Sequence, residues 1–90
     1  MKITIEKPDE ATLAGRKVRS WPIWQTEISR FEWSYDSTEE CLLLEGRVIV
    51  ETADGERIEF RKGDFVTFPR GLSCTWDIKE PVKKHYNFRD

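Results

Sequence analysis

The sequence is poor in the residue types that build metal centres and disulfide networks. Its 90 residues include one histidine and two cysteines. One histidine excludes any site that needs several imidazole ligands, and two cysteines are too few for the disulfide framework of a small secreted domain. Because so few cysteines fit a reducing compartment, we expect a cytoplasmic protein.

The sequence also lacks a large excess of charge of one sign and long hydrophobic runs. Fifteen Lys and Arg residues against 17 Asp and Glu residues give a net charge of −2. Since nucleic-acid-binding proteins usually carry a basic excess, we expect no nucleic-acid partner. No apolar run approaches the ~20 residues of a transmembrane helix, and no signal-peptide pattern opens the chain. We therefore expect no membrane partner.

Aromatic residues, in contrast, are plentiful. The chain contains four Trp, two Tyr and five Phe residues, and large rings supply much of the buried area that an ordered domain needs. A chain of 90 residues can bury one modest core and leaves no room for a second. We therefore predict a single domain over residues 1–90.

Most of the chain has the pattern of β-strands. Residues 31–35 alternate aromatic with polar side chains, which is typical of a half-buried strand. Residues 41–44 are apolar at every position, as expected of a strand that is covered on both faces. Asp54-Gly55 predicts a hairpin turn between two further strands.

Breaks in the pattern define the fold class. The four prolines are spread along the chain and predict local breaks, including a turn at Glu80-Pro81. Acidic residues followed by a glycine predict one short helical turn over residues 8–15, the only helix that we expect. About eight short strands with turns every ~6–12 residues predict an all-β, antiparallel sandwich or barrel.

Glycine and proline recur at a characteristic spacing in the second half of the chain. Gly63, Pro69 and Gly71 fit the pattern G-x5-P-x-G, in which the glycines allow tight turns and the proline ends a strand. This pattern resembles the second motif of the cupin superfamily. Glu39 and Gly46 match the glutamate and the last glycine of the first cupin motif.

The resemblance covers residues 31–88 and implies a single-domain cupin, an antiparallel β-barrel or jelly roll. The chain is most similar to the small branch related to ureidoglycine aminohydrolase and to the cupin protein of ethanolamine utilisation. Residues 21–24, the pair Cys74 and Trp76, and residues 81–86 support this branch. Since small cupins commonly pair through their sheets, the resemblance also implies a homodimer. Residues 21–24 would then form either a dimer contact or ordinary core packing.

The metal-binding positions of the family are mostly replaced. Cupins hold a metal ion with three histidines and a glutamate, and the corresponding positions here are Trp33, Tyr35, Glu39 and Cys74. An indole N–H has no lone pair to donate, and a phenol with a pKa near ~10 stays protonated without a strong Lewis acid. We therefore expect a degenerate metal site with no metal ion and no other cofactor.

The same positions predict a polar pocket with aromatic walls in the lumen of the barrel. A tyrosine hydroxyl, a carboxylate and a thiol would meet a ligand, and indole rings would stack on it. His85, near the end of the chain, is a further candidate, although a lone histidine is more often structural. The candidate ligand-binding residues are Trp33, Tyr35, Glu39, Cys74, Trp76 and His85.

Several of these residues have an equally simple structural interpretation. Glu39 would be solvated or paired with an arginine such as Arg70. Cys74 would be an inert core thiol or, with Cys41, one half of a disulfide. Lys83 and Lys84 would form a solvated face, or one of them would pair with Glu39 or with an anionic ligand.

Three functions follow from these alternatives. In the first, the protein is a metal-free cupin that binds a small polar metabolite in its lumen. In the second, it is a metal-assisted enzyme of C–N hydrolysis or isomerisation, with Glu39 and Cys74 as candidate catalytic residues. In the third, it is a structural or regulatory dimer whose own rings fill the lumen. The free volume inside the barrel distinguishes the third function from the other two.

Overall fold

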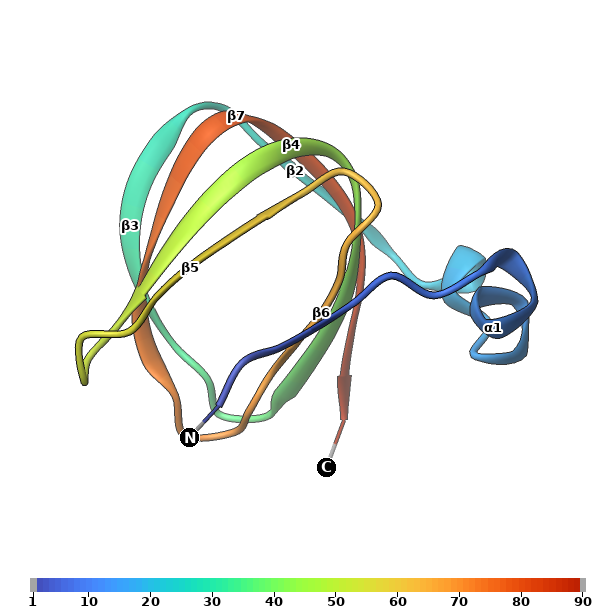
Figure 1. The fold of residues 1–90 in the computed structure, drawn as a ribbon, viewed down its shortest axis with the longest axis horizontal. Coiled ribbons are helices and arrows are strands. Elements are labelled where there is room, and N and C mark those ends of the chain that lie inside the picture. The colour runs from blue at the N-terminus through green and yellow to red at the C-terminus, as the bar shows by residue number, and fades with distance from the viewer. Residues whose placement is uncertain (1, 90) are drawn as a thin grey trace.

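The protein is a strongly curved antiparallel β-sheet with one short helix beside it (Figure 1). The structure, a computed structural model, describes residues 2–89. Within these residues seven strands follow the order β1-β6-β4-β7-β2, with β3 paired to β7 and β5 paired to β4. The elements are β1 (Thr4–Glu6), α1 (Glu10–Gly15), the 3₁₀-helix η1 (Val18–Ser20), β2 (Ile23–Thr26), β3 (Ser29–Ser34), β4 (Thr38–Thr52), β5 (Arg57–Arg61), β6 (Phe65–Phe68) and β7 (Ser73–Arg89).

Two long strands form the centre of the sheet. β4 has 15 residues and β7 has 17, and the two pair along nearly their whole length. β7 also pairs with β3 and β2 along its other edge. All strand pairs in the described part of the chain are antiparallel, so the predicted all-β antiparallel fold is confirmed. Several expected short strands are parts of one continuous strand.

The predicted turn at Glu80-Pro81 is wrong, because β7 runs through both residues. β3 pairs with residues 73–78 of β7 and β2 pairs with residues 82–85. Pro81 lies between these two paired segments, where its nitrogen does not have to donate a hydrogen bond to either strand. On the opposite edge the register with β4 shifts next to Gly46, whose φ is +109°. A β-bulge therefore accommodates the proline inside the strand.

The strand with apolar residues at consecutive positions is covered on both faces, as predicted. Cys41 and Leu43 belong to the main core cluster inside the barrel. Leu42 points the other way, into a second cluster with Leu13 and Phe65 beneath the helix. The helix therefore covers one outer face of the barrel wall, and the lumen lies on the opposite face of the same strand.

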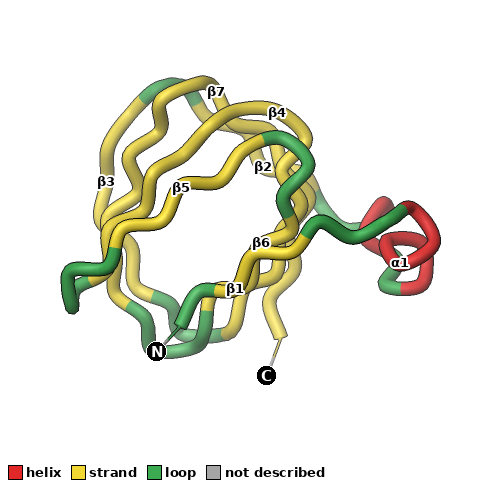
Figure 2. Tube along the Cα trace, in the orientation of Figure 1, coloured by secondary structure: helices red, strands yellow, loops and turns green. Residues whose placement is uncertain are grey.

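The short helix predicted over residues 8–15 is present as α1, outside the barrel (Figure 2). Asp9 caps it, because the backbone N–H of Thr12 donates a hydrogen bond to Asp9 Oδ1 at 2.8 Å. This bond holds the pKa of the Asp9 carboxyl below its usual value. Among residues 2–89, no helix has the length and apolar character needed to cross a membrane.

Candidate functional site

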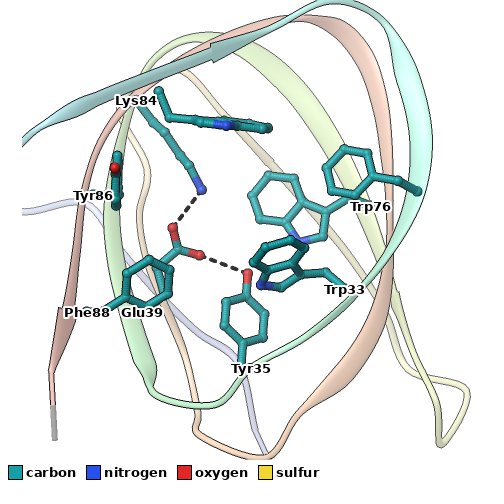
Figure 3. Close-up of a pocket in the computed structure, with 9 residues that line it drawn as sticks. Trp33, Tyr35, Glu39, Trp76, Lys84, Tyr86 and Phe88 are labelled. Atoms are coloured by element: carbon teal, nitrogen blue, oxygen red, sulfur yellow. Dashed lines mark hydrogen bonds and ion pairs between the residues drawn. The ribbon is translucent and has the colours of Figure 1, made fainter.

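The lumen of the barrel contains a cavity of about 240 Å³. Aromatic rings form most of its wall, and one carboxylate and one ammonium group lie among them (Figure 3). Its volume is slightly below the ~300–1,000 Å³ of typical ligand pockets, so it suits a molecule smaller than most drugs. The lining residues are Trp24, Phe31, Trp33, Tyr35, Glu39, Trp76, Lys84, Tyr86 and Phe88.

Strand alternation directs these side chains into the lumen. Successive residues of a strand point to opposite faces, so residues of one parity share a face. Four lining residues of β7 have even numbers: Trp76, Lys84, Tyr86 and Phe88. On the neighbouring strand β4, Glu39 lies directly opposite Phe88 in the register. The site is therefore built mainly on the two longest strands.

The aromatic wall is packed ring against ring. Phe31 of β3 stacks on Trp76 with ring centroids 6.1 Å apart and an angle of 12° between the planes. Trp24 of β2 meets the same indole edge to face at 6.3 Å. Trp33 is 48% exposed, whereas Trp76 is 2% exposed. Trp33 therefore lies at the mouth of the cavity and Trp76 lies at its inner wall.

A buried ion pair occupies the wall of the cavity. Lys84 Nζ lies 2.7 Å from Glu39 Oε2, and the side chains of these residues are 6% and 4% exposed. The Tyr35 hydroxyl donates a hydrogen bond of 2.8 Å to Glu39 Oε1 (Figure 3). The ammonium group also lies over two indole rings, 4.5 Å from the centroid of Trp76 and 4.9 Å from that of Trp24.

These contacts offset the cost of burying two charges. Moving an ion out of water costs several kcal/mol even after relaxation, so a lone buried lysine or glutamate is unfavourable. Opposite charges 4 Å apart attract by ~4 kcal/mol at an effective dielectric of about 20, and a desolvated cation–π contact contributes ~2 kcal/mol. The ion pair, the tyrosine and the two indoles therefore form one connected unit.

Burial keeps the hydroxyl of Tyr35 and the thiols of Cys41 and Cys74 protonated. Burial raises the pKa of the Tyr35 hydroxyl far above its ordinary value, and the negative charge of Glu39 raises it further. Burial likewise raises the pKa of the Cys41 thiol to about 12 and that of Cys74 to about 11. All three groups are protonated at neutral pH, so Tyr35 donates its proton to Glu39 and neither thiol is an activated nucleophile.

Four of the six candidate residues lie together at the cavity: Trp33, Tyr35, Glu39 and Trp76. Cys74 is not among the lining residues and packs in the core cluster. Both cysteines are free thiols, so the alternative of a Cys41–Cys74 disulfide is wrong.

His85 does not lie with the other candidates either. Its Nδ1 is 2.9 Å from the backbone oxygen of Trp21, near the start of β2 and outside the lumen. As an odd-numbered residue of β7 it points away from the face that carries Lys84. The residue thus has a structural partner, in line with the simpler interpretation of a lone histidine.

The most important lumen residue outside the candidate set is Lys84. The sequence left it open whether this lysine is solvated or pairs with Glu39, and the structure shows the pair. Trp76 and Lys84 both have even numbers, so alternation along one strand would have placed Lys84 inside the barrel. The turn predicted at Pro81 separates the two residues in the sequence interpretation. The further lining residues outside the candidate set are Trp24, Phe31, Tyr86 and Phe88.

The donor set does not fit the metal of other cupins. Of the four motif positions, Tyr35 is a protonated phenol bonded to Glu39, while Trp33 offers no lone pair. The glutamate already holds the ammonium group of Lys84, which would repel a cation. Within residues 2–89 no group of three or more His, Cys, Asp or Glu side chains could hold a metal ion.

The curved antiparallel sheet and its lined lumen define the class of this protein, a small cupin. Residues 13–86 match the family of EutQ-like cupin domains, and the chain belongs to this family. The resemblance found in the sequence is thereby confirmed. No curated protein matches the chain.

Solved structures of related proteins share the fold. A DUF861 family protein from Thermotoga maritima is 50% identical, with a TM-score of 0.96 over 98% of this chain and 100% of that one. A putative ethanolamine utilization protein Q from Salmonella typhimurium is 26% identical, with a TM-score of 0.67 over 73% of this chain and 53% of that one. The EutQ protein of Clostridium difficile is 15% identical, with a TM-score of 0.67 over 73% of this chain and 52% of that one, which shows a common fold alone.

Proposed function

We propose that this protein binds a small polar organic molecule in the lumen of its barrel. The observation that carries the proposal is the cavity of about 240 Å³ with a buried ion pair in its wall. Apolar enclosure with a few fixed polar groups is the usual character of a ligand site. The aromatic rings would bury the flat or apolar part of the ligand, while Lys84 and Glu39 would orient its polar part.

The free volume favours this function over a lumen filled by its own side chains. The seven aromatic residues that line the cavity leave a space that several ligand atoms can enter. The metal-assisted enzyme has less support, because the ammonium group of Lys84 lies on the one retained ligand, Glu39. Binding in the lumen needs only the groups that are already in place.

The indole N–H signals of the four tryptophans provide a direct test by NMR. Trp24, Trp33 and Trp76 line the cavity, whereas Trp21 lies outside it, 6.0 Å from the ring of Phe65. A ligand in the lumen is expected to shift the first three signals and leave that of Trp21 unchanged. The titrants are a library of small polar organic molecules at millimolar concentration.

One outcome would contradict lumen binding, and a second would contradict the orienting role of the ion pair. One is a library in which no compound shifts the signals of the three lumen tryptophans. The other is a Glu39→Gln protein, folded as judged by its spectrum, that binds every hit with unchanged affinity. Glutamine keeps the shape of the side chain and removes its charge, so this variant isolates the electrostatic contribution of the ion pair.

A further inference from the structure

We propose that the ligand of the lumen is a small planar carboxylate whose charged group binds to Lys84 and to the indole N–H of Trp76. This inference rests on the proposed binding function and names the chemical class of its ligand. It follows from a comparison of the hydrogen-bond donors and acceptors of the cavity: which of them already have a partner, and which do not.

The acceptors at the ion pair already have partners. Glu39 Oε1 accepts from the Tyr35 hydroxyl at 2.8 Å, and Glu39 Oε2 accepts from Lys84 Nζ at 2.7 Å. The tyrosine has a single proton, which it donates to the carboxylate. A carboxylate oxygen can accept a second bond, so a ligand donor would share an oxygen that Tyr35 or Lys84 already uses.

Among the residues that the structure describes, two donors at the site also keep N–H bonds that no acceptor oxygen or nitrogen uses. An ammonium group carries three N–H bonds, and within residues 2–89 Lys84 donates one of them to a side chain, that of Glu39. Its other contacts are the faces of two indole rings. The Nε1 of Trp76 is buried and, in the described part of the chain, has no hydrogen bond of good geometry. The indole N–H lies against the thiol of Cys74 and offsets part of the rise that burial causes in the pKa of that thiol. Because sulfur is a weak acceptor, this donor gains a stronger hydrogen bond when a ligand brings an oxygen.

Charge leads to the same class of ligand. An aromatic cage beside a carboxylate usually attracts a cation, but this cage already contains one, the ammonium group of Lys84 over Trp76 and Trp24. A second cation in a cavity of about 240 Å³ would lie close to the first and be repelled. Glu39 would repel a carboxylate, but both of its oxygens already accept from Lys84 and Tyr35. The remaining N–H bonds of Lys84 and the N–H of Trp76, in contrast, can donate to the two oxygens of a ligand carboxylate.

The shape of the site favours a flat molecule. The inner wall consists of rings, with Phe31 stacked on Trp76 and Trp24 edge-on to both. A planar unsaturated or aromatic group can stack against such a wall, whereas a bulky branched group would leave gaps in a cavity of this size. The carboxylate would lie at the inner end and the flat group toward the exposed ring of Trp33.

Three probes that share a benzene ring and have similar size test the inference: benzoate, benzamide and benzylamine. Each is titrated into the intact protein, and the four indole N–H signals are followed by NMR. We expect benzoate to bind most tightly, benzamide at least about tenfold more weakly, and benzylamine weakest, since a charge-assisted hydrogen bond is lost or reversed. The N–H signal of Trp76 should move downfield most, because it alone gains a hydrogen bond.

Matched variants assign the effect to the lumen. Lys84→Met alone would leave Glu39 buried without its partner, so the test variant is the neutral pair Lys84→Met with Glu39→Gln. It should lose the preference for benzoate. Lys83→Met removes the same charge from the adjacent residue, which lines a different pocket that shares no residue with the lumen cavity, and should bind benzoate normally. Trp76→Phe keeps a ring, removes the N–H and should weaken benzoate selectively.

The outcomes separate the two proposals. Benzylamine or benzamide binding as tightly as benzoate would overturn the carboxylate assignment and leave lumen binding intact. Library compounds that bind while none of the three probes does would also overturn it. If neither the probes nor the library shift the lumen tryptophans, the binding function itself is wrong. If the double variant does not fold, the ranking of the three probes on the unmodified protein decides.

Discussion

At the scale of single residues, Lys84 determines the chemistry of the lumen. Its ammonium group contacts Glu39 and two indole rings, at the carboxylate that other cupins use to hold a metal ion. A fixed cation offers charge and hydrogen-bond donors but no open coordination position. The lumen therefore suits recognition of an anion better than coordination chemistry.

Removal of this cation should destabilise the fold. Lys84→Met leaves the carboxylate of Glu39 buried without its partner, and breaking such a pair costs about 3–5 kcal/mol. We expect a loss of this order in the free energy of unfolding, measured by urea denaturation at pH 7. Adding Glu39→Gln should recover most of the loss, and the control Lys83→Met should change stability by less than about 0.5 kcal/mol. Equal losses for Lys84→Met and Lys83→Met would contradict a buried pair.

The buried thiols should make stability fall at alkaline pH. Near pH 7 the Cys41 thiol is protonated in the folded and the unfolded chain, so it contributes no pH dependence there. Between pH 9 and about 12 the unfolded chain loses this proton while the folded chain keeps it. The free energy of unfolding then falls by up to about 1.4 kcal/mol per pH unit for each such thiol.

A cysteine variant isolates this effect. We expect Cys41→Ala to be less stable at pH 8, because it leaves a small cavity. Its free energy of unfolding should nevertheless fall less steeply than that of the unmodified protein between pH 9 and 11. Guanidinium denaturation at each pH measures both slopes, and identical slopes would show that the thiol of Cys41 does not remain protonated in the fold.

At the scale of elements, the bulge between β4 and β7 lets β7 continue through Pro81 with the same side chains facing the lumen. Gly46 provides the positive φ of +109°, and the register of the two strands shifts beside it. A Cβ at this position would lie 2.6 Å from the backbone oxygen of Pro81. The bulge thus depends on a residue without a side chain, and it keeps Lys84 on the same face as Trp76.

A single methyl group at the bulge should be damaging. Gly46→Ala places a side chain in a strained conformation and against backbone, so we expect a loss of at least about 1–3 kcal/mol in the free energy of unfolding. Gly15→Ala at the end of α1 is the matched control, because the added Cβ meets no atom within 4 Å. Thermal unfolding followed by circular dichroism compares the two. Similar midpoints for both variants would mean that β4 and β7 do not need this bulge.

At the scale of the whole molecule, the sequence predicts a homodimer by its resemblance to small cupins that pair through their sheets. Sedimentation velocity over a range of micromolar concentrations is expected to give one species with twice the mass of the chain. A single species with the mass of one chain at all concentrations would contradict this prediction. The homodimer and the cytoplasmic location both stay predictions.

Local sequence pattern predicts much of the fold. The alternation in residues 31–35 and the double-sided apolar run at residues 41–44 correspond to strands with those faces. The cupin motifs placed Tyr35 and Glu39 at one site, where they share a hydrogen bond. Motif spacing succeeds here because a strand repeats every two residues, so a fixed separation along the chain fixes the face.

Spacing along the chain does not fix the inward face where a strand departs from its regular repeat. Glu80-Pro81 predicts a turn, so the face of Trp76 cannot be followed along the sequence to Lys84, and nothing in the sequence shows which way His85 points. Cys74 corresponds to a ligand position of the family, yet its thiol packs in the core and does not line the cavity. Neither outcome can be derived from spacing, because both depend on which strands lie on the two sides of β7.

The order of residues alone therefore determined the fold class, the family and the loss of the histidine ligands, because these properties follow from local periodicity and residue chemistry. Only the tertiary structure decided that a lysine lies on the retained glutamate and that a cavity exists between the rings. Those two facts depend on how residues 45 positions apart, Glu39 and Lys84, meet across a bulged pair of strands.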